Sequence, residues 1–327
     1  MRTVVSVIVL AAALLLPDLS AAADFRMWQV PWEKTRPRDP AVDAKGRVWF
    51  VGQGGDYVAW LDPQSGEFTR HDLPDGTGPH NLVVGRHEDR AGDIWIAGNR
   101  AGWIGRMDPE SGDLEKFDTT KDNVKDPHTL IEADDGRIWF TAQHSNRIGV
   151  FDPESRDIQV WEAATERARP YGIVLDENGQ PWSVLVGTNK LATIEDGKLR
   201  QVDLPRVDAR PRRLDIVDGK IWYVDYAGGY VGSYSPENDA FEEWRSPSGE
   251  DAAPYGAVAA GDIFYYVETG PQPNRMIGIN TETGNFIYDE PVPDSGGAVR
   301  HMFHDAKRDA IWFGTDTNYI GRFNPPR

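Results

Sequence analysis

A short unit repeats seven times along this chain, at spacings of 41 to 48 residues. Each copy opens with a proline and a variable residue, continues as an apolar run and leads to an aromatic residue, which is a tryptophan in six copies. A period of this size is typical of repeat architectures in which each copy forms one supersecondary unit. The residues after the proline are Arg38, His80, His128, Tyr171, Arg212, Tyr255 and, in a degenerate copy that has valine in place of proline, Arg300.

Each copy carries the pattern of four short strands. In the third copy a strand around Trp139 is followed by residues 147–151, a turn that starts at Asp152, and residues 158–161. Alternating β-branched and aromatic residues between turn residues indicate strands. Four strands in roughly 40–50 residues are typical of a propeller blade. We therefore predict an all-β fold, a single seven-bladed β-propeller over residues 24–327 with four-stranded antiparallel blades.

The two ends of the chain are expected to close the ring together. The seventh copy stops directly after its third strand, and residues 25–30 resemble the fourth strands of the other copies. If this N-terminal strand completes the last blade, no open sheet edge is left to attract aggregation. The central aromatic of each copy should fill the space between blades: Trp49, Trp95, Trp139, Trp182, Trp222, Phe264 and Trp312.

Residues 1–23 have the pattern of a cleaved signal peptide. Arg2 supplies a positive start, residues 4–16 are almost entirely apolar, and three alanines at 21–23 precede Asp24. Thirteen residues are too few to span a bilayer, and small residues follow them. We expect an exported protein, periplasmic or secreted, with no membrane span. The chain has no cysteine, so burial and hydrogen bonding alone must stabilise it.

The net charge of −17 makes nucleic acid an unlikely class of partner, because an acidic surface repels phosphate backbones. The same charge suits solubility in an exposed compartment. We expect a monomer that binds a small-molecule or peptide ligand at the mouth of the propeller channel.

Two rings of side chains are predicted to meet at that mouth. The innermost strand of each blade starts there with the residue after the proline. The second strand returns to the same rim four residues after the central aromatic, at Gln53, Asn99, Gln143, Val186, Tyr226, Glu268 and Asp316. A concave mouth lined by convergent polar groups is the default binding site. The alternative is that these side chains only hydrogen-bond one another and water in the channel.

One arc of the rim has the residues for acid–base chemistry. His80 and His128 lie on neighbouring blades, and Tyr171 follows on the next. A neutral imidazole can act as a general base near neutral pH. Asp126 and Gln143 offer oxygen ligands for a hard cation such as Mg²⁺, which would stabilise an enolate-like charge. We therefore predict His128 and His80 as catalytic, and Asp126 and Gln143 as metal ligands.

The remaining rim positions are expected to bind substrate. Arg38, Arg212 and Arg300 form a basic arc that could receive an anionic group, and Tyr171 and Tyr255 complete the predicted set. His301 lies close enough to the channel to be a further candidate.

Three segments of the third repeat carry a family resemblance: residues 126–130 (DPHTL), 135–141 (DGRIWFT) and 146–149 (NRIG). They resemble the repeats of the streptogramin B (virginiamycin B) lyases, which are seven-bladed propellers, and the resemblance extends over the whole mature chain. It implies a carbon–oxygen lyase that opens a cyclic depsipeptide by Mg²⁺-assisted elimination at the ester linkage. By that resemblance His128 is the base, His80 its partner and Asp126 one metal ligand.

The sequence leaves two other functions open. The family has a second glutamate where this chain has Gln143, and the loss of that carboxylate favours a non-catalytic periplasmic propeller that binds a ligand or a protein. A metal-dependent lactonase would need a convergent set of oxygen ligands, for which Asn99, Glu268 and Asp316 have suitable side chains on three different blades.

Overall fold

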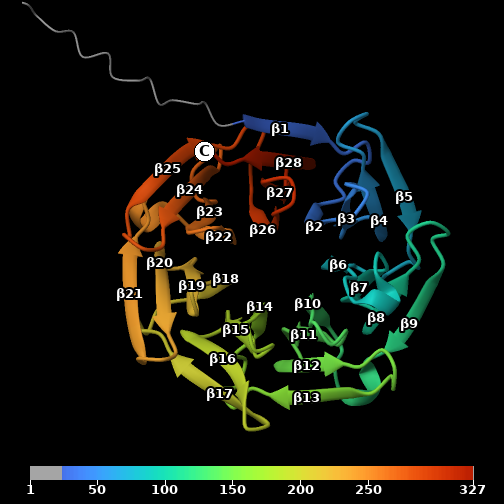
Figure 1. Cartoon of the computed structure of the whole chain (residues 1–327), viewed down its shortest axis with the longest axis horizontal. Helices are drawn as coiled ribbons and strands as arrows, with labels where there is room; N and C mark the ends of the chain where they lie inside the picture. Colours follow the sequence, from blue (N-terminus) through green and yellow to red (C-terminus); the bar gives the residue numbers. More distant parts are fainter. Residues whose placement is uncertain (1–23, 327) are drawn as a thin grey trace, which may run out of the picture.

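The computed structural model describes residues 24–326. Seven four-stranded antiparallel sheets stand around a central axis, so the predicted seven-bladed β-propeller is confirmed (Figure 1). The predicted signal peptide lies outside the described residues.

The innermost strands line the channel, and the second strands pair with them in the same order. The innermost strands are β2 (Pro37–Val42), β6 (Leu82–Val84), β10 (Pro127–Glu132), β14 (Pro170–Leu175), β18 (Pro211–Val217), β22 (Pro254–Ala260) and β26 (Val299–Asp305). The second strands are β3 (Val48–Gly52), β7 (Ile94–Gly98), β11 (Ile138–Ala142), β15 (Pro181–Leu185), β19 (Lys220–Asp225), β23 (Ile263–Glu268) and β27 (Ala310–Thr315).

The third and fourth strands complete each blade toward the outside. The third strands are β4 (Tyr57–Leu61), β8 (Trp103–Met107), β12 (Arg147–Phe151), β16 (Lys190–Glu195), β20 (Tyr230–Ser235), β24 (Arg275–Asn280) and β28 (Tyr319–Asn324). The fourth strands are β5 (Phe68–Asp72), β9 (Leu114–Asp118), β13 (Ile158–Glu162), β17 (Lys198–Asp203), β21 (Ala240–Arg245), β25 (Phe286–Pro291) and β1 (Asp24–Gln29).

The helical segments of the described chain are short 3₁₀ turns: η1 (Glu88–Arg90), η2 (Thr120–Asp122) and η3 (Gly249–Asp251). None of the helices between residues 24 and 326 has the length and apolar character needed to cross a bilayer.

Strand β1 closes the ring, as predicted. It pairs antiparallel with β28, from Asp24 opposite Asn324 to Gln29 opposite Tyr319, and so supplies the fourth strand of the last blade (Figure 1). The pairing gives the last blade the same four strands as the others, so the circle of blades has no incomplete member.

The predicted central aromatics form the core between blades. All seven side chains are 7% exposed or less. Trp49, for example, packs with Leu82 and Ile96 of the next blade. Because these large rings fill the wedge-shaped space between twisted sheets, their burial fixes the spacing of the blades around the axis.

A β-bulge follows the opening residues of six innermost strands. In the third blade Pro127 lies opposite Ala142 but Leu130 lies opposite Phe140, so His128 and Thr129 together face a single partner residue. The register shifts in the same way in five other blades. A bulge breaks the alternation of side chains. As a result, two consecutive residues of one strand can turn toward the channel.

Candidate functional site at the channel mouth

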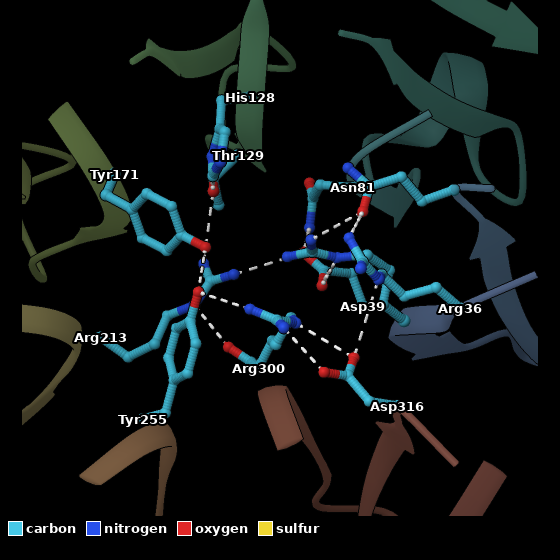
Figure 2. Close-up of polar contacts among 12 residues, drawn as sticks. Arg36, Asp39, Asn81, His128, Thr129, Tyr171, Arg213, Tyr255, Arg300 and Asp316 are labelled. Atoms are coloured by element: carbon cyan, nitrogen blue, oxygen red, sulfur yellow. Dashed lines mark hydrogen bonds and ion pairs between the residues drawn. The ribbon is translucent and has the colours of Figure 1, made fainter. Parts of the chain in front are cut away.

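The two predicted rings meet at one mouth of the channel, where side chains from several blades converge (Figure 2). Arg38 donates from Nη1 to Oε1 of Gln53 at 3.3 Å, and Arg300 forms a bidentate ion pair with Asp316. The guanidinium of Arg212 stacks on the ring of Tyr226, 4.5 Å from its centroid. In these three blades, the second residue of the innermost strand therefore contacts the residue that directly follows the second strand.

His80 and His128 form a contact pair. Their ring centroids are 3.4 Å apart, and the ring of Tyr171 lies 4.3 Å from that of His128. The two imidazoles are only 5% and 2% exposed, respectively. Nδ1 of His128 is 2.9 Å from Oγ1 of Thr129, whereas the buried Nδ1 of His80 has no hydrogen-bond partner within residues 24–326. The structure thus brings together the two histidines that the sequence assigned to catalysis.

Burial holds both histidines neutral. It is the main cause that places the pKa of His80 and of His128 well below the usual range, and the nearby cation of Arg38 lowers both further. A neutral imidazole can accept a proton, although a lowered pKa makes it a weaker base. For Nε2 of His128 to carry the free lone pair, Nδ1–H must donate to Thr129.

Tyr171 and Tyr255 join across the channel. Their hydroxyl oxygens are 2.6 Å apart, and Nη1 of Arg300 donates to the hydroxyl of Tyr255 at 3.4 Å (Figure 2). Burial raises the pKa of Tyr171 to about 12. Burial also acts on Tyr255, but there the cations of Arg38 and Arg300 outweigh it and lower the pKa. The predicted substrate-binding residues therefore hydrogen-bond one another in this structure.

Arg38 is a buried cation beside the histidine pair. Its Nε donates to Oδ1 of Asp39 at 2.9 Å, and the side chains are 4% and 0% exposed. Burial by itself raises the pKa of Asp39, but Arg38, His301 and Arg213 outweigh it and hold the carboxyl ionised. The buried Nη2 of Arg38 has no hydrogen-bond partner among the described residues.

A polar network deeper in the channel was missed by the sequence analysis. Arg213 crosses the channel: its Nη2 lies 3.4 Å from Oδ2 of Asp39, and its Nη1 donates to Oγ1 of Thr129 at 3.3 Å. The Nδ2 of Asn81 donates to the same Asp39 oxygen at 3.0 Å (Figure 2). We call Asp39, Asn81, Thr129 and Arg213 the channel network. Its signal in the sequence is a polar residue two positions after the repeat proline, which the bulge turns inward.

Of the two predicted metal ligands, Asp126 is engaged in a loop. The carboxylate of Asp126 accepts hydrogen bonds from the backbone N–H groups of His144 and Ser145 and from the hydroxyl of Ser145. Among residues 24–326 no three His, Cys, Asp or Glu side chains are grouped so that they could hold a metal ion. Asp126 and neutral Gln143 thus do not fit a Mg²⁺ site built from carboxylates. Binding of Mg²⁺ stays a prediction, and we derive no chemical step from it.

Asn99, Glu268 and Asp316, the three residues considered for a lactonase site, each form hydrogen bonds or an ion pair with different partners. Asn99 donates to the backbone carbonyl of Pro127 at 3.1 Å, and the carboxylate of Glu268 accepts from Ser246 and Ser248. Asp316 pairs with Arg300. Each side chain has a structural partner of its own, so the structure gives no support to a shared metal among them.

Fold and site together define a seven-bladed propeller with a buried histidine pair and interlocked aromatic and basic side chains at one mouth. The profile of the Virginiamycin B lyase family matches residues 18–270 of the chain. The chain belongs to the virginiamycin B lyase family.

Individual relatives agree with this assignment. The virginiamycin B lyase of Nocardia farcinica (strain IFM 10152) is 28% identical over 93 residues, which are 28% of this chain and 31% of that protein. The aligned part therefore spans about a third of the relative. The virginiamycin B lyase structure from Staphylococcus aureus superimposes with a TM-score of 0.82 at 21% identity, covering 93% of this chain and all of the other. A streptogramin B lyase structure gives 0.80 at 21% identity, covering 92% and 97%. At these identities the two structures support the fold.

Proposed function

We propose that this protein is a carbon–oxygen lyase that opens an ester linkage in a cyclic depsipeptide-like or lactone-type substrate, with His128 as the base. The observation that carries the proposal is the contact between two buried, neutral histidines on neighbouring blades of a virginiamycin B lyase family propeller. A solved relative is a catalytically inactive histidine-to-alanine variant of the Staphylococcus aureus lyase with quinupristin.

The proposed elimination breaks a carbon–hydrogen bond and a carbon–oxygen bond of the substrate and forms one carbon–carbon double bond. His128 takes a proton from the carbon next to a substrate carbonyl, and the electron pair of that bond forms a carbon–carbon double bond. The ester carbon–oxygen bond then breaks, and the departing oxygen leaves as part of a carboxylate. A general base of this kind contributes a rate factor of roughly 10² to 10⁴. His80 packs against the ring of His128 and restricts its orientation.

Arg38 is the group that would stabilise negative charge in this step. Its Nη2 is buried, has no hydrogen-bond partner among the described residues, and belongs to the cation that depresses the pKa of both histidines. A preorganised donor in a site that excludes water stabilises a developing enolate-like oxygen. The contact between Tyr171 and Tyr255 would have to open to admit a substrate.

The test is direct incubation of the purified protein with a streptogramin B depsipeptide, with Mg²⁺ and with EDTA, followed by mass spectrometry. A ring-opened product of unchanged mass indicates elimination, whereas hydrolysis adds the mass of one water. We expect His128→Ala to lower the rate by about 10² or more. His144→Ala, which replaces an exposed histidine, is the matched control and should keep the rate. Unchanged substrate, or an unchanged rate in His128→Ala, would remove the proposal.

A non-catalytic binding propeller is the second candidate. The observations that favour it are the hydrogen bond that joins Tyr171 to Tyr255 and the neutral Gln143 in place of a carboxylate. It predicts a ligand or partner protein that docks at the same mouth and is released unchanged.

A further inference from the structure

The half of the channel away from the histidine pair contains a cavity of about 1020 Å³. All seven innermost strands line it, with residues such as Leu82, Leu130 and Met302. Asn81, Thr129 and Arg213 of the channel network also line it, so the network separates this cavity from the rim that carries His80 and His128.

The wall of this cavity is largely apolar; its charged residues include Asp215 of β18 and Glu132 of β10 as well as residues of the far turns such as Lys45 and Glu110. Ala41, Ile173, Leu214 and Ala257 are among the wall residues. Ligand pockets in proteins are typically about 300–1,000 Å³, with apolar walls and a few placed polar groups. The size and lining of this cavity fit that description. The cavity therefore suits a molecule with an apolar body better than water alone.

The inner end of the cavity is polar and carries a net positive charge. Arg213 lines the cavity and shares the carboxylate of Asp39 with Arg38 of the rim, so these two guanidinium groups have one carboxylate between them. Arg213 uses three of its five N–H donors, toward Thr129, Asp39 and the backbone carbonyl of Arg300. His301 lines the cavity beside them, and its Nδ1 has no hydrogen-bond partner among the described residues.

We propose that this cavity is a second binding site, which takes an amphipathic carboxylate with its apolar body along the channel and its anionic head at Arg213 and His301. The uncompensated positive charge at the inner end selects the anionic head, because a buried cation favours an opposite charge nearby. The site is independent of the proposed lyase reaction, which takes place on the other side of the channel network.

The test is calorimetric titration of the mature protein with decanoate, and separately with decyltrimethylammonium as a probe of equal chain length and opposite charge. We expect saturable one-to-one binding of decanoate and no saturable binding of the cation. The net charge of the protein is −17, so non-specific attraction would give the reverse order. Reversed or equal binding, or no saturable binding of decanoate, would overturn the proposal.

Two histidines on the same strand supply the matched variants. His301 and His304 of β26 both line the cavity, but His301 interacts with Asp39 and Arg213 whereas His304 interacts with Asp305 and Asp309. His301→Leu should weaken decanoate binding about tenfold, the loss of one hydrogen bond to a charged group. His304→Leu should change it less than about twofold, since it is away from the head group. Equal effects in both variants would overturn the placement of the head group. The comparison of the two probes on the wild-type protein decides the proposal even if His301→Leu does not fold.

Discussion

The two halves of the channel differ although the same seven strands line both. At the rim, large side chains such as His128, Tyr171 and Tyr255 fill the axis and contact one another. In the opposite half, residues such as Ala41 and Ala257 leave a cavity of about 1020 Å³. In six of the strands a bulge near the repeat proline separates the two: it brings two consecutive residues, such as His128 and Thr129, to the axis, and regular pairing resumes beyond it. One repeat unit thus builds a packed end that carries the histidine pair and an open apolar end.

Among the substitutions considered, the largest loss of stability is expected in the channel network, where the two halves of the channel meet. Asp39→Asn removes the carboxylate that pairs with two buried guanidinium groups, those of Arg38 and Arg213. Breaking a buried pair in this way costs about 3–5 kcal/mol, because an uncompensated charge is left behind. Urea denaturation should show this loss in the free energy of unfolding.

Asp316→Asn is the matched control, since Asp316 pairs with Arg300 but both side chains are partly exposed to solvent. Its cost should be about 1 kcal/mol or less. Equal costs for the two substitutions would show that the channel network does not hold the halves together.

Acid should weaken the protein through its buried histidines. Burial lowers the pKa of His301 to about 4 and places that of His80 and His128 well below the usual range. Below about pH 6.5 the unfolded chain binds protons that the folded histidines do not, so the free energy of unfolding falls as the pH drops toward 4. His301 contributes at most about 3 kcal/mol to this loss in the free energy of unfolding.

His301→Leu should remove the contribution of His301 to the pH dependence. The difference between the unfolding free energies of this variant at pH 7.5 and 4.5 should therefore be smaller than in the wild-type protein. An identical pH dependence in the two proteins would contradict a buried neutral His301. His304→Leu again serves as the control, because His304 interacts with Asp305 and Asp309 and lies outside the channel network.

The smallest loss of stability is expected for a substitution at the rim, where Tyr171 and Tyr255 meet. Tyr171→Phe removes the hydroxyl that pairs with Tyr255, and the cost should be about 1 kcal/mol because Arg300 still donates to Tyr255. If this contact restricts access to His128, the same variant should increase the rate at which a small imidazole-modifying reagent labels His128. Unchanged labelling would show that the contact does not close the rim.

Much of the fold follows from the repeat alone. The proline spacing, the central aromatics and the resemblance of residues 25–30 to a fourth strand predicted seven blades and the closure by β1. The proximity of His80 and His128 also followed, because neighbouring blades place equivalent residues side by side.

The channel network could not be deduced in the same way. Strict alternation along a strand would turn Thr129 away from the side that His128 faces, and only the bulge brings both to the axis. The pairing of Asp39 with Arg213 joins residues from blades far apart in the sequence, for which the repeat pattern specifies no contact. The loop contacts of Asp126 likewise depend on backbone N–H groups, which every residue type except proline supplies.

The central claim is that the channel network divides the channel into two separate sites, and histidine side-chain NMR tests it most directly. With ¹⁵N-labelled histidine, the imidazole signals of His80 and His128 report on the rim and that of His301 on the opposite cavity. We predict that decanoate shifts the His301 signal and leaves those of His80 and His128 in place, and that a streptogramin B depsipeptide does the reverse. If both ligands shift the same histidines, the two halves form one site and the account is wrong.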